Sequence, residues 1–426
     1  ITPNFGNELT TPRDNVTLSH NLVLPSPSTG ALGTLANREF VDFVNGQADQ
    51  EISWNEVGII SVAAALNQGN YLGASTNIST TTASHVGRFY PDHFTLGNVV
   101  DGDIYSTCEA NNTIKNYTYV GETTIADSTV GALRYGVQPK FTITANAFCA
   151  SGICSTTQNY QGAFDKLSLN GVALTTPTED YTTSGVTNKM ALVANINSAQ
   201  MDNVDGVITY TFSNSDNYVY QRDDNAKRGE FTADINLGID SITDTDGVNA
   251  KDYTSADDSD FTEILTLHPA GSLIRFGRWR IENAYGPENA TLMTPMFIDV
   301  FNGAAFVAHT DDNCTTPQIT RVNNASALSL FEYKLTDQDN SDTLLVGDTA
   351  AQSTGMFVNG QFNQFTFSAP NNNKQGPLLF EYAVPSWLKY DWTDGNGPFN
   401  ENPTSLVSFG LFRGNDRIIS WQEVGN

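Results

Sequence analysis

Short runs in which apolar and polar residues alternate dominate this chain of 426 residues. In such a run every second side chain faces the same way, which is typical of a half-buried β-strand. The clearest runs cover residues 141–145, 207–212, 296–301 and 361–367. A helical period is almost absent, and the one helix that the pattern predicts is short, around residues 61–68.

Turn signals separate these runs at frequent intervals. The pair Asn-Gly, which tolerates the positive φ angles of tight hairpin turns, occurs at 45/46, 170/171, 302/303, 359/360 and 396/397. The clearest predicted hairpin covers 167–174, and a closing hairpin is predicted around Gly414-Asn415-Asp416. Many short strands with frequent turns predict an all-β fold of tandem antiparallel β-sandwich domains, immunoglobulin-like or jelly-roll-like.

The length suggests about three domains. We place the boundaries near residues 97 and 254, the second of them in an acidic, polar stretch over 240–260. The prediction is an N-terminal β domain over 1–97, an immunoglobulin-like β-sandwich over 98–254 and a C-terminal β domain over 255–426.

The chain is strongly acidic, with 47 acidic and 21 basic residues and a formal net charge of −26. This balance argues against nucleic-acid binding and against docking on anionic lipid, since both partners need a basic face. No run of apolar residues is long enough for a membrane-spanning helix, so we expect no direct membrane insertion. The start, Ile1-Thr2-Pro3, is no signal peptide and lacks Met, so we expect a mature form or a fragment.

Four cysteines allow three disulfide patterns. Cys149 and Cys154 flank a loop of four residues, and we predict a disulfide across that hairpin-like loop. Cys108 and Cys314 either pair across domains or stay free, and the sequence leaves both alternatives open.

Catalytic signals are weak in this sequence. The five histidines are scattered, and they form no metal-binding pair of the kind that zinc enzymes use. Neither a nucleophile elbow nor a Gly-rich phosphate loop is present. Carboxylates are abundant, but abundance alone does not indicate a catalytic pair. We therefore predict that the protein is no enzyme and that it has no certain cofactor.

Calcium is the one cofactor for which the acidic residues are suited. Ca²⁺ takes six to eight oxygen ligands, and acidic loops with a Gly bend can supply them. Two loops have this composition, and their candidate ligands are Asp244, Asp246, Asn249 and Asp252 in the first, and Asp391, Asp394 and Asn396 in the second. The alternative for both loops is a plain turn.

A second candidate site combines arginines with aromatic residues. Arg278 and Arg280 share a presumed strand with Trp279, and alternation places Trp279 on the opposite face from both. A guanidinium beside an aromatic ring could bind a sugar or a peptide. Trp387, Tyr390 and Trp392 cluster further along the chain and are the other candidate ligand-binding residues. The alternatives are cross-strand pairing of the arginines with acids, and a core position for the aromatic residues.

Several motifs resemble the C-terminal region of MshQ proteins, which belong to the mannose-sensitive haemagglutinin (MSHA) type IV pilus system of Gram-negative bacteria. The resemblance runs in order from about residue 40 onward, and its most specific motifs are Gly-Arg-Phe-Tyr-Pro-Asp-His-Phe at 87–94 and Arg-Gly-Asn-Asp-Arg at 413–417. Further similar segments are 54–60, 71–73, Cys108, 117–121, 142–147, 158–160, 275–278, 282–286, 301–303, 310–314, 385–388 and 409–412.

The resemblance implies an exported, β-rich protein of the Gram-negative envelope, cell surface or pilus, with a role in pilus biogenesis and attachment. It carries no active-site residues to this chain. We therefore expect a non-enzymatic, adhesin-like array of rigid β domains, with pilus subunits or a surface glycan as partners. The alternatives are a carbohydrate-binding module that recognises a surface glycan and a structural filament subunit that assembles through its edge strands.

Overall fold

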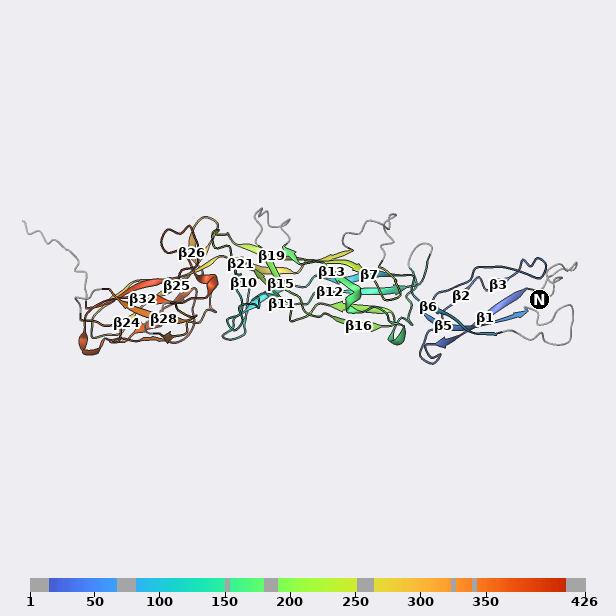
Figure 1. The fold of residues 1–426 in the computed structure, drawn as a ribbon, viewed down its shortest axis with the longest axis horizontal. Helices are drawn as coiled ribbons and strands as arrows, with labels where there is room; N and C mark the ends of the chain where they lie inside the picture. Colours follow the sequence, from blue (N-terminus) through green and yellow to red (C-terminus); the bar gives the residue numbers. More distant parts are fainter. Residues whose placement is uncertain are drawn as a thin grey trace, which may run out of the picture.

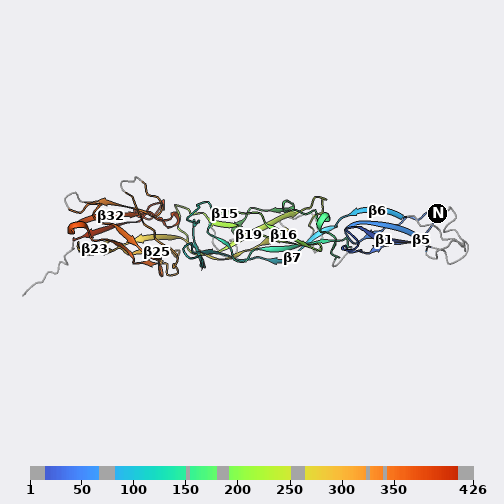
Figure 2. The same cartoon turned by 90° about the horizontal axis from the view of Figure 1, so that it is seen from below.

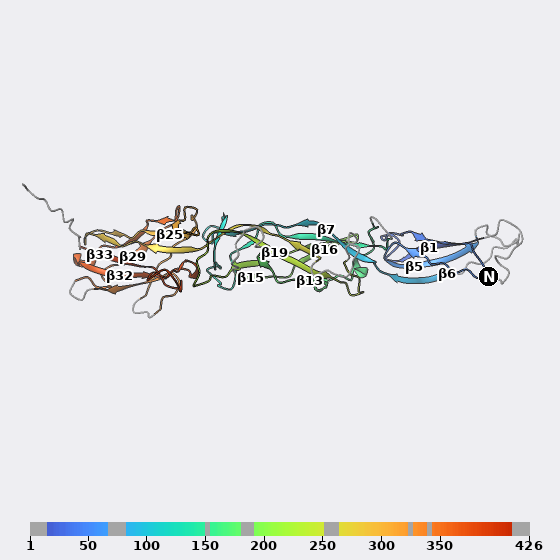
Figure 3. The ribbon, with the colours of Figure 1, turned by 90° about the horizontal axis from the view of Figure 1, so that it is seen from above.

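The computed structural model describes residues 15–66, 82–149, 154–179, 191–250, 264–322, 327–338 and 343–410. Its regular elements are strands and four short 3-10 helices, so the predicted all-β fold is confirmed. The strands form three β units that follow one another end to end in a slender rod (Figures 1, 2 and 3). They are termed the first (15–90), middle (91–276) and last (277–410) units. Within the described part of the chain, no helix has the length and apolarity needed to cross a bilayer.

The first unit contains a four-stranded sheet in the order β3-β1-β5-β6 and a small β2–β4 pair. Its core is small, with Leu22, Leu35, Trp54 and Ile60 at its centre. The strands are β1 (Val16–Leu24), β2 (Leu35–Ala36), β3 (Glu39–Phe40), β4 (Ser53–Trp54), β5 (Gly58–Leu66) and β6 (Thr82–Phe89).

The helix predicted around residues 61–68 is wrong over its described part, because residues 61–66 lie in β5. This strand pairs with β1 on one side and with β6 on the other. The small residues at 63–65 suit a helix by propensity, but pairing on both sides decides the conformation here.

The middle unit has a large core, with 0% exposure of Phe141, Ile143, Ile208 and Tyr218. The predicted strands over 141–145 and 207–212 are central to it and pair with each other without an irregularity. Its elements are β7 (His93–Val100), β8 (Ile104–Thr107), β9 (Ile114–Lys115), β10 (Tyr117–Tyr119), β11 (Arg134–Tyr135), β12 (Lys140–Asn146), η1 (Gly162–Phe164), η2 (Leu169–Gly171), β13 (Val172–Leu174), β14 (Thr178–Glu179), β15 (Leu192–Asn195), β16 (Gln200–Val204), β17 (Val207–Thr211), β18 (Asn217–Tyr220), β19 (Phe231–Ile242), β20 (Leu265–Leu267) and β21 (Ala270–Arg275).

The last unit has a core rich in aromatic residues, among them Trp279, Phe365, Phe380 and Tyr382. Its largest sheet has the order β23-β33-β32-β28-β27. Its elements are β22 (Gly277–Ile281), β23 (Ala284–Gly286), β24 (Leu292–Met293), β25 (Met296–Phe301), β26 (Phe306–Ala308), β27 (Thr320–Arg321), β28 (Glu332–Asp337), β29 (Ala351–Ser353), β30 (Gln361–Phe362), β31 (Phe365–Phe367), η3 (Asn371–Asn373), β32 (Gly376–Tyr382), η4 (Ser386–Leu388) and β33 (Thr404–Phe409).

The predicted hairpin over 167–174 is wrong. Residues 169–171 form the 3-10 turn η2, and β13 pairs with the long strand β19 and not with the segment before it. By contrast, Asn359 and Gly360 have the positive φ angles expected of an Asn-Gly turn. The predicted closing hairpin around residues 414–416 lies outside the described residues.

The domain boundaries near residues 97 and 254 stay a prediction. Residue 97 lies within β7, whose sheet partner is β12 of the middle unit, and residue 254 lies outside the described residues.

The contact between the first and middle units is termed the first joint. Asn159 binds three backbone groups across it: its side chain accepts from Ala31 N–H at 2.7 Å and donates to Ala31 and Val57 carbonyls at 2.8 and 3.0 Å. The Glu56 carboxylate accepts from the backbone N–H groups of residues 57, 158 and 159. Burial raises the pKa of Glu56 although these bonds oppose the shift. Arg88 forms an ion pair with Asp246 nearby.

Candidate functional site at the second joint

The contact between the middle and last units, termed the second joint, is crossed by an almost unbroken strand. β21 ends at Arg275 in the middle unit, and β22 begins at Gly277 in the last unit, with only Phe276 between them. A side chain at residue 277 would not fit, because its Cβ would lie 2.6 Å from the Tyr119 ring and 2.8 Å from Leu388. The chain therefore passes between the units without a linker.

Cys108 and Cys314 form a disulfide across this joint. Cys108 follows β8 of the middle unit, Cys314 follows β26 of the last unit, and 206 positions of sequence separate them. Of the two alternatives that the sequence left open, the structure contains the cross-domain pair. The predicted disulfide between Cys149 and Cys154 is also present.

A buried network of polar side chains lies beside this disulfide. The Tyr119 hydroxyl donates to Asp312 Oδ2 at 2.7 Å and lies 2.7 Å from His309 Nδ1. Arg275 Nη1 lies 2.6 Å from His309 Nε2. Since arginine can only donate, Nε2 accepts and the proton of the neutral imidazole sits on Nδ1, where it is donated to Tyr119. The network thus joins β10 and β21 of the middle unit to the segment after β26.

The electrostatics of the network keep His309 neutral. Burial lowers its pKa to about 4, against the opposing influence of Asp312. Burial alone would raise the pKa of Asp312, but hydrogen bonds from Thr315, Tyr119 and the Cys314 N–H outweigh burial and lower it. Asp312 is therefore a buried carboxylate whose donors are supplied by both units.

A second clasp lies on another part of the joint and centres on Arg222. Its guanidinium donates to the backbone carbonyls of Trp387 and Lys389, the latter at 2.7 Å, and lies 4.0 Å from the centre of the Phe276 ring. Burial lowers the pKa of Arg222 to about 10. Next to it, Lys227 donates to the Gly395 carbonyl at 2.7 Å. The loop after β18 is therefore held by η4 and the loop after it.

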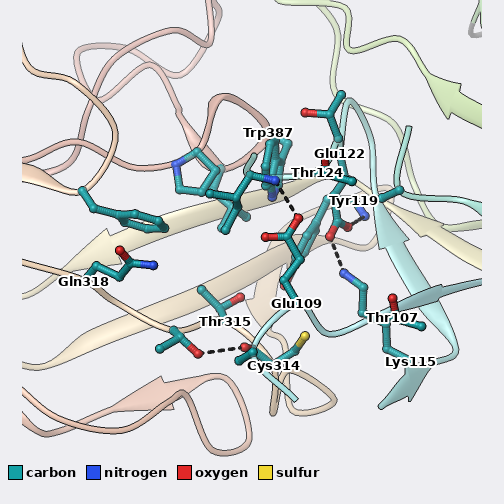
Figure 4. A pocket seen from close by; sticks show the side chains of 18 of the residues that line it. Thr107, Glu109, Lys115, Tyr119, Glu122, Thr124, Cys314, Thr315, Gln318 and Trp387 are labelled. Carbon is teal, nitrogen blue, oxygen red and sulfur yellow. Dashed lines mark hydrogen bonds and ion pairs between the residues drawn. The ribbon is translucent and has the colours of Figure 1, made fainter. Parts of the chain in front are cut away.

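A pocket of about 350 Å³ opens at the joint beside these contacts. In Figure 4, Gln318, Thr315 and Cys314 of the last unit lie along one side, and Lys115, Tyr119 and Glu122 of the middle unit lie across from them. The full lining is Thr107, Glu109, Ala110, Lys115, Tyr119, Glu122, Thr123, Thr124, Ile125, Ala132, Arg134, Cys314, Thr315, Thr316, Gln318, Phe331, Pro385, Trp387 and Leu388.

The charged residues of this pocket are mostly paired. Lys115 forms an ion pair with Glu122, whose other carboxylate oxygen accepts from the Tyr119 N–H at 2.8 Å. Glu109 accepts from the Ile125 N–H at 2.6 Å. No hydrogen bond or ion pair holds the guanidinium of Arg134 within the described residues.

The predicted arginine and aromatic site is brought together only in part. Within β22 the alternation is confirmed, with Trp279 buried and Arg278 and Arg280 half-buried. Both arginines pair with Asp299 on the neighbouring strand β25, at 3.1 Å, which is the cross-strand pairing considered as the alternative. Arg278 also lies 5.1 Å from the Tyr390 ring and 5.5 Å from the Trp392 ring.

Trp387 lies apart from that group. It belongs to η4 and lines the joint pocket. Trp387 and Tyr390 are both buried, at 8% and 7% exposure, and Tyr390 packs on Phe306 and Phe399. Sugar or peptide binding by the predicted residues stays a prediction for Arg278, Arg280, Trp387, Tyr390 and Trp392.

The two acidic loops that were candidates for calcium form tight turns. Asp244 accepts from the N–H groups of residues 246 and 248 and from the Tyr160 hydroxyl, and Asp246 pairs with Arg88. Asp391 accepts from the N–H groups of residues 393, 394, 396 and 397. Among the described residues, no three His, Cys, Asp or Glu side chains gather as a metal site, and Asp252 lies outside them. Calcium binding stays a prediction.

Sequence reasoning missed most residues of the second joint. Asp312 stands in the segment 310–314, which was noted only for its cysteine and its resemblance to MshQ proteins, and His309 was only one of five scattered histidines. Tyr119 stands in the similar segment 117–121, and Arg222 in none. Neither residue indicated a joint, because their partners lie 190 and 165 positions away in the chain.

Two family profiles match this chain. The profile described as "DUF6701, third domain" matches residues 56–265, and "DUF6701, fourth domain" matches residues 275–424. Together the two matches cover well over half of the sequence. The chain belongs to the DUF6701 family. The two matched segments of this DUF6701 chain begin at Glu56, in the first joint, and at Arg275, in the second joint.

No curated protein matches this DUF6701 chain. Among solved structures, that of the Escherichia coli adhesin FdeC aligns with 92% of this chain and 85% of its own, at 10% identity and a TM-score of 0.27. The Yersinia pseudotuberculosis adhesin InvE aligns with 74% of this chain and 61% of its own, at 10% identity and a TM-score of 0.19. TM-scores this low do not indicate a shared fold or function.

Proposed function

We propose that this DUF6701 chain belongs to an exported, non-enzymatic surface protein that acts with an MSHA-type IV pilus, in pilus biogenesis and adhesin-like attachment. The observation that carries the proposal is the second joint, where one strand crosses between units and a disulfide ties them together. A protein that holds a partner at a fixed distance from its anchor needs such coupling, because a flexible linker would let the spacing vary.

Three further observations support this function. Disulfides persist in oxidising compartments, so the pairs Cys108–Cys314 and Cys149–Cys154 favour an exported protein. The net charge of −26 favours a soluble, self-repelling surface and disfavours nucleic acid. The resemblance to MshQ sequences supports the link to an MSHA-type pilus.

The polar network of the second joint supports a role without catalysis. Tyr119, His309 and Asp312 combine residue types that serve as acids and bases in enzymes. Here they are 2%, 1% and 0% exposed, and each is bonded to the others or to a neighbouring backbone group. Groups so placed hold two units together and leave no reacting atom open to a substrate.

The proposal is tested in a bacterium that carries both the pilus and this protein. We expect tagged full-length protein to capture pilin subunits and its deletion to reduce attachment. The double substitution Cys108→Ser/Cys314→Ser should reduce attachment while the protein still reaches the surface. Cys149→Ser/Cys154→Ser is the matched control, because it removes a disulfide away from the joint.

Two results would contradict the proposal. One is attachment unchanged by the deletion, together with no pilin captured. The other is concentration-dependent growth of the purified protein into long assemblies in light scattering, which would instead favour a structural filament subunit.

A further inference from the structure

The joint pocket has the size and rigidity of a preformed ligand site. Its volume of about 350 Å³ lies within the range of small-molecule pockets. Its walls are fixed by the Cys108–Cys314 disulfide on one side and by the bonds of Arg222 to the carbonyls of η4 on the other. A site with such walls loses little conformational freedom when a ligand enters.

Polar groups with unused hydrogen-bonding capacity belong to this lining. The hydroxyls of Thr107 and Thr123 and the side-chain amide of Gln318 have no hydrogen-bond partner within the described residues, and the Arg134 guanidinium has none either. Together these groups can donate and accept, which suits a ligand that carries several hydroxyls.

The charges of the lining disfavour a strongly ionic ligand. Lys115 and Glu122 neutralise each other, and Glu109 is engaged by the Ile125 N–H. Arg134 carries the one cationic group without a partner in the described lining, so a phosphate or sulfate would find a single arginine in a lining that also contains the carboxylate of Glu109. A neutral polyhydroxyl ligand meets no such repulsion, and an arginine fork can bond two adjacent hydroxyl oxygens.

Aromatic and aliphatic residues complete the pocket and provide an apolar surface. Trp387, Phe331 and Ile125 line it, and the indole N–H of Trp387 forms no hydrogen bond within the described residues. Pyranose rings have an apolar C–H face and a polar rim, so they match a pocket that combines an aromatic wall with hydroxyl and amide groups.

We infer that the joint pocket binds a neutral sugar of one or two pyranose rings, with Trp387 against the ring face and Thr107, Thr123 and Gln318 on its hydroxyls. This assignment is independent of the rod function proposed above. A rod without a sugar site would still couple pilus and target, and a sugar site would still exist without a pilus.

The test is saturation-transfer NMR on the purified, oxidised chain. The probes are methyl glycosides of glucose, galactose, mannose and N-acetylglucosamine, together with their disaccharides. We expect saturation of ring C–H protons by at least one probe, with a Kd of about 0.1–10 mM. The substitutions Gln318→Ala and Thr123→Val should each weaken binding about fivefold, the usual consequence of one lost hydrogen bond.

The control is Thr209→Val, which removes a hydroxyl from β17 of the middle unit, away from the pocket. It should leave the affinity unchanged, and all three variants should melt close to the wild type. The proposal is overturned if no probe is saturated, or if the affinity is the same in the two pocket variants as in the control. Tighter binding of a uronic acid than of the matching neutral sugar would also overturn the assignment to neutral sugars.

Discussion

The two joints of this rod use different chemistry for the same task. The first joint is held by hydrogen bonds from Asn159 and Glu56 to backbone groups and by one ion pair, between Arg88 and Asp246. The second joint has a disulfide, a buried network around His309 and a buried arginine clasp. We therefore expect the middle and last units to respond as one body, whereas the first unit can detach at a smaller cost.

The largest difference should come from the disulfides. In the chain-entropy account, a bridge that closes a loop of 206 positions stabilises by about 5 kcal/mol, and one that closes 5 positions by about 2 kcal/mol. Cys108→Ser/Cys314→Ser should therefore lower the free energy of unfolding more than Cys149→Ser/Cys154→Ser. Urea unfolding without reductant measures both. Equal losses would mean that loop closure is not what the long bridge contributes.

Removal of the arginine clasp should have the next largest effect. Arg222→Ala leaves the carbonyls of Trp387 and Lys389 without their buried donor, at a cost of about 2–4 kcal/mol. Arg222→Lys keeps a charge but loses the planar fork, so it should recover only part of that loss. Small-angle scattering and urea unfolding together check this. Full recovery with lysine would show that charge alone matters at this position.

Acid should weaken the second joint through His309. Between pH 6.5 and about 4 the imidazole of His309 binds a proton in the unfolded chain but not in the folded protein. The free energy of unfolding is therefore retained above pH 6.5 and decreases as the pH falls. The loss should reach on the order of 3 kcal/mol near pH 4. His309→Gln should flatten this part of the curve of unfolding free energy against pH, although Asp312, whose pKa is lowered in the folded protein, still contributes at the acid end. An unchanged slope in His309→Gln would contradict a folded state in which the imidazole of His309 stays neutral.

Asn159→Ala should weaken the first joint and leave the second joint unchanged. It removes three hydrogen bonds to the backbone of the first unit, at a cost of about 1–3 kcal/mol. Hydrogen exchange should rise around Ala31 and Val57 and stay unchanged around Tyr119 and His309. Increased exchange at both joints would show that the rod loosens as a whole.

The smallest effect is expected from Arg88→Ala. Its ion pair with Asp246 is partly exposed to solvent, and such pairs contribute about 1 kcal/mol or less. The thermal midpoint should shift little at low salt and not at all at high salt. A loss as large as that of Asn159→Ala would make this pair a main contact of the first joint.

The sequence allowed the strands to be predicted better than the joints. Alternation identified β12 and β17, and within β22 it placed Trp279 on the opposite face from Arg278 and Arg280, because the period of a strand is local. Phe276 shares the face of Arg278 by alternation but is fully buried, since at that point it packs into the core of the middle unit.

Other features depend on contacts that no local pattern contains. Asn170-Gly171 has the composition of a hairpin turn, but both residues lie in a 3-10 turn. The strand that follows, β13, pairs with a strand more than 60 positions away. The pairing of Cys108 with Cys314 and the meeting of Tyr119 with His309 arise only when the units stand end to end. The short bridge at Cys149–Cys154 was predictable because its two cysteines are only five positions apart in the sequence.

The long bridge has a mechanical consequence. When the two ends of the chain are pulled apart, the covalent path runs from Cys108 directly to Cys314 and bypasses everything between them. At about 3.5 Å per residue, the 206 positions so shielded would otherwise release roughly 700 Å of slack. Under tension, most of the middle unit therefore cannot be extended, and the protein stays short even if the segments outside the bridge unfold.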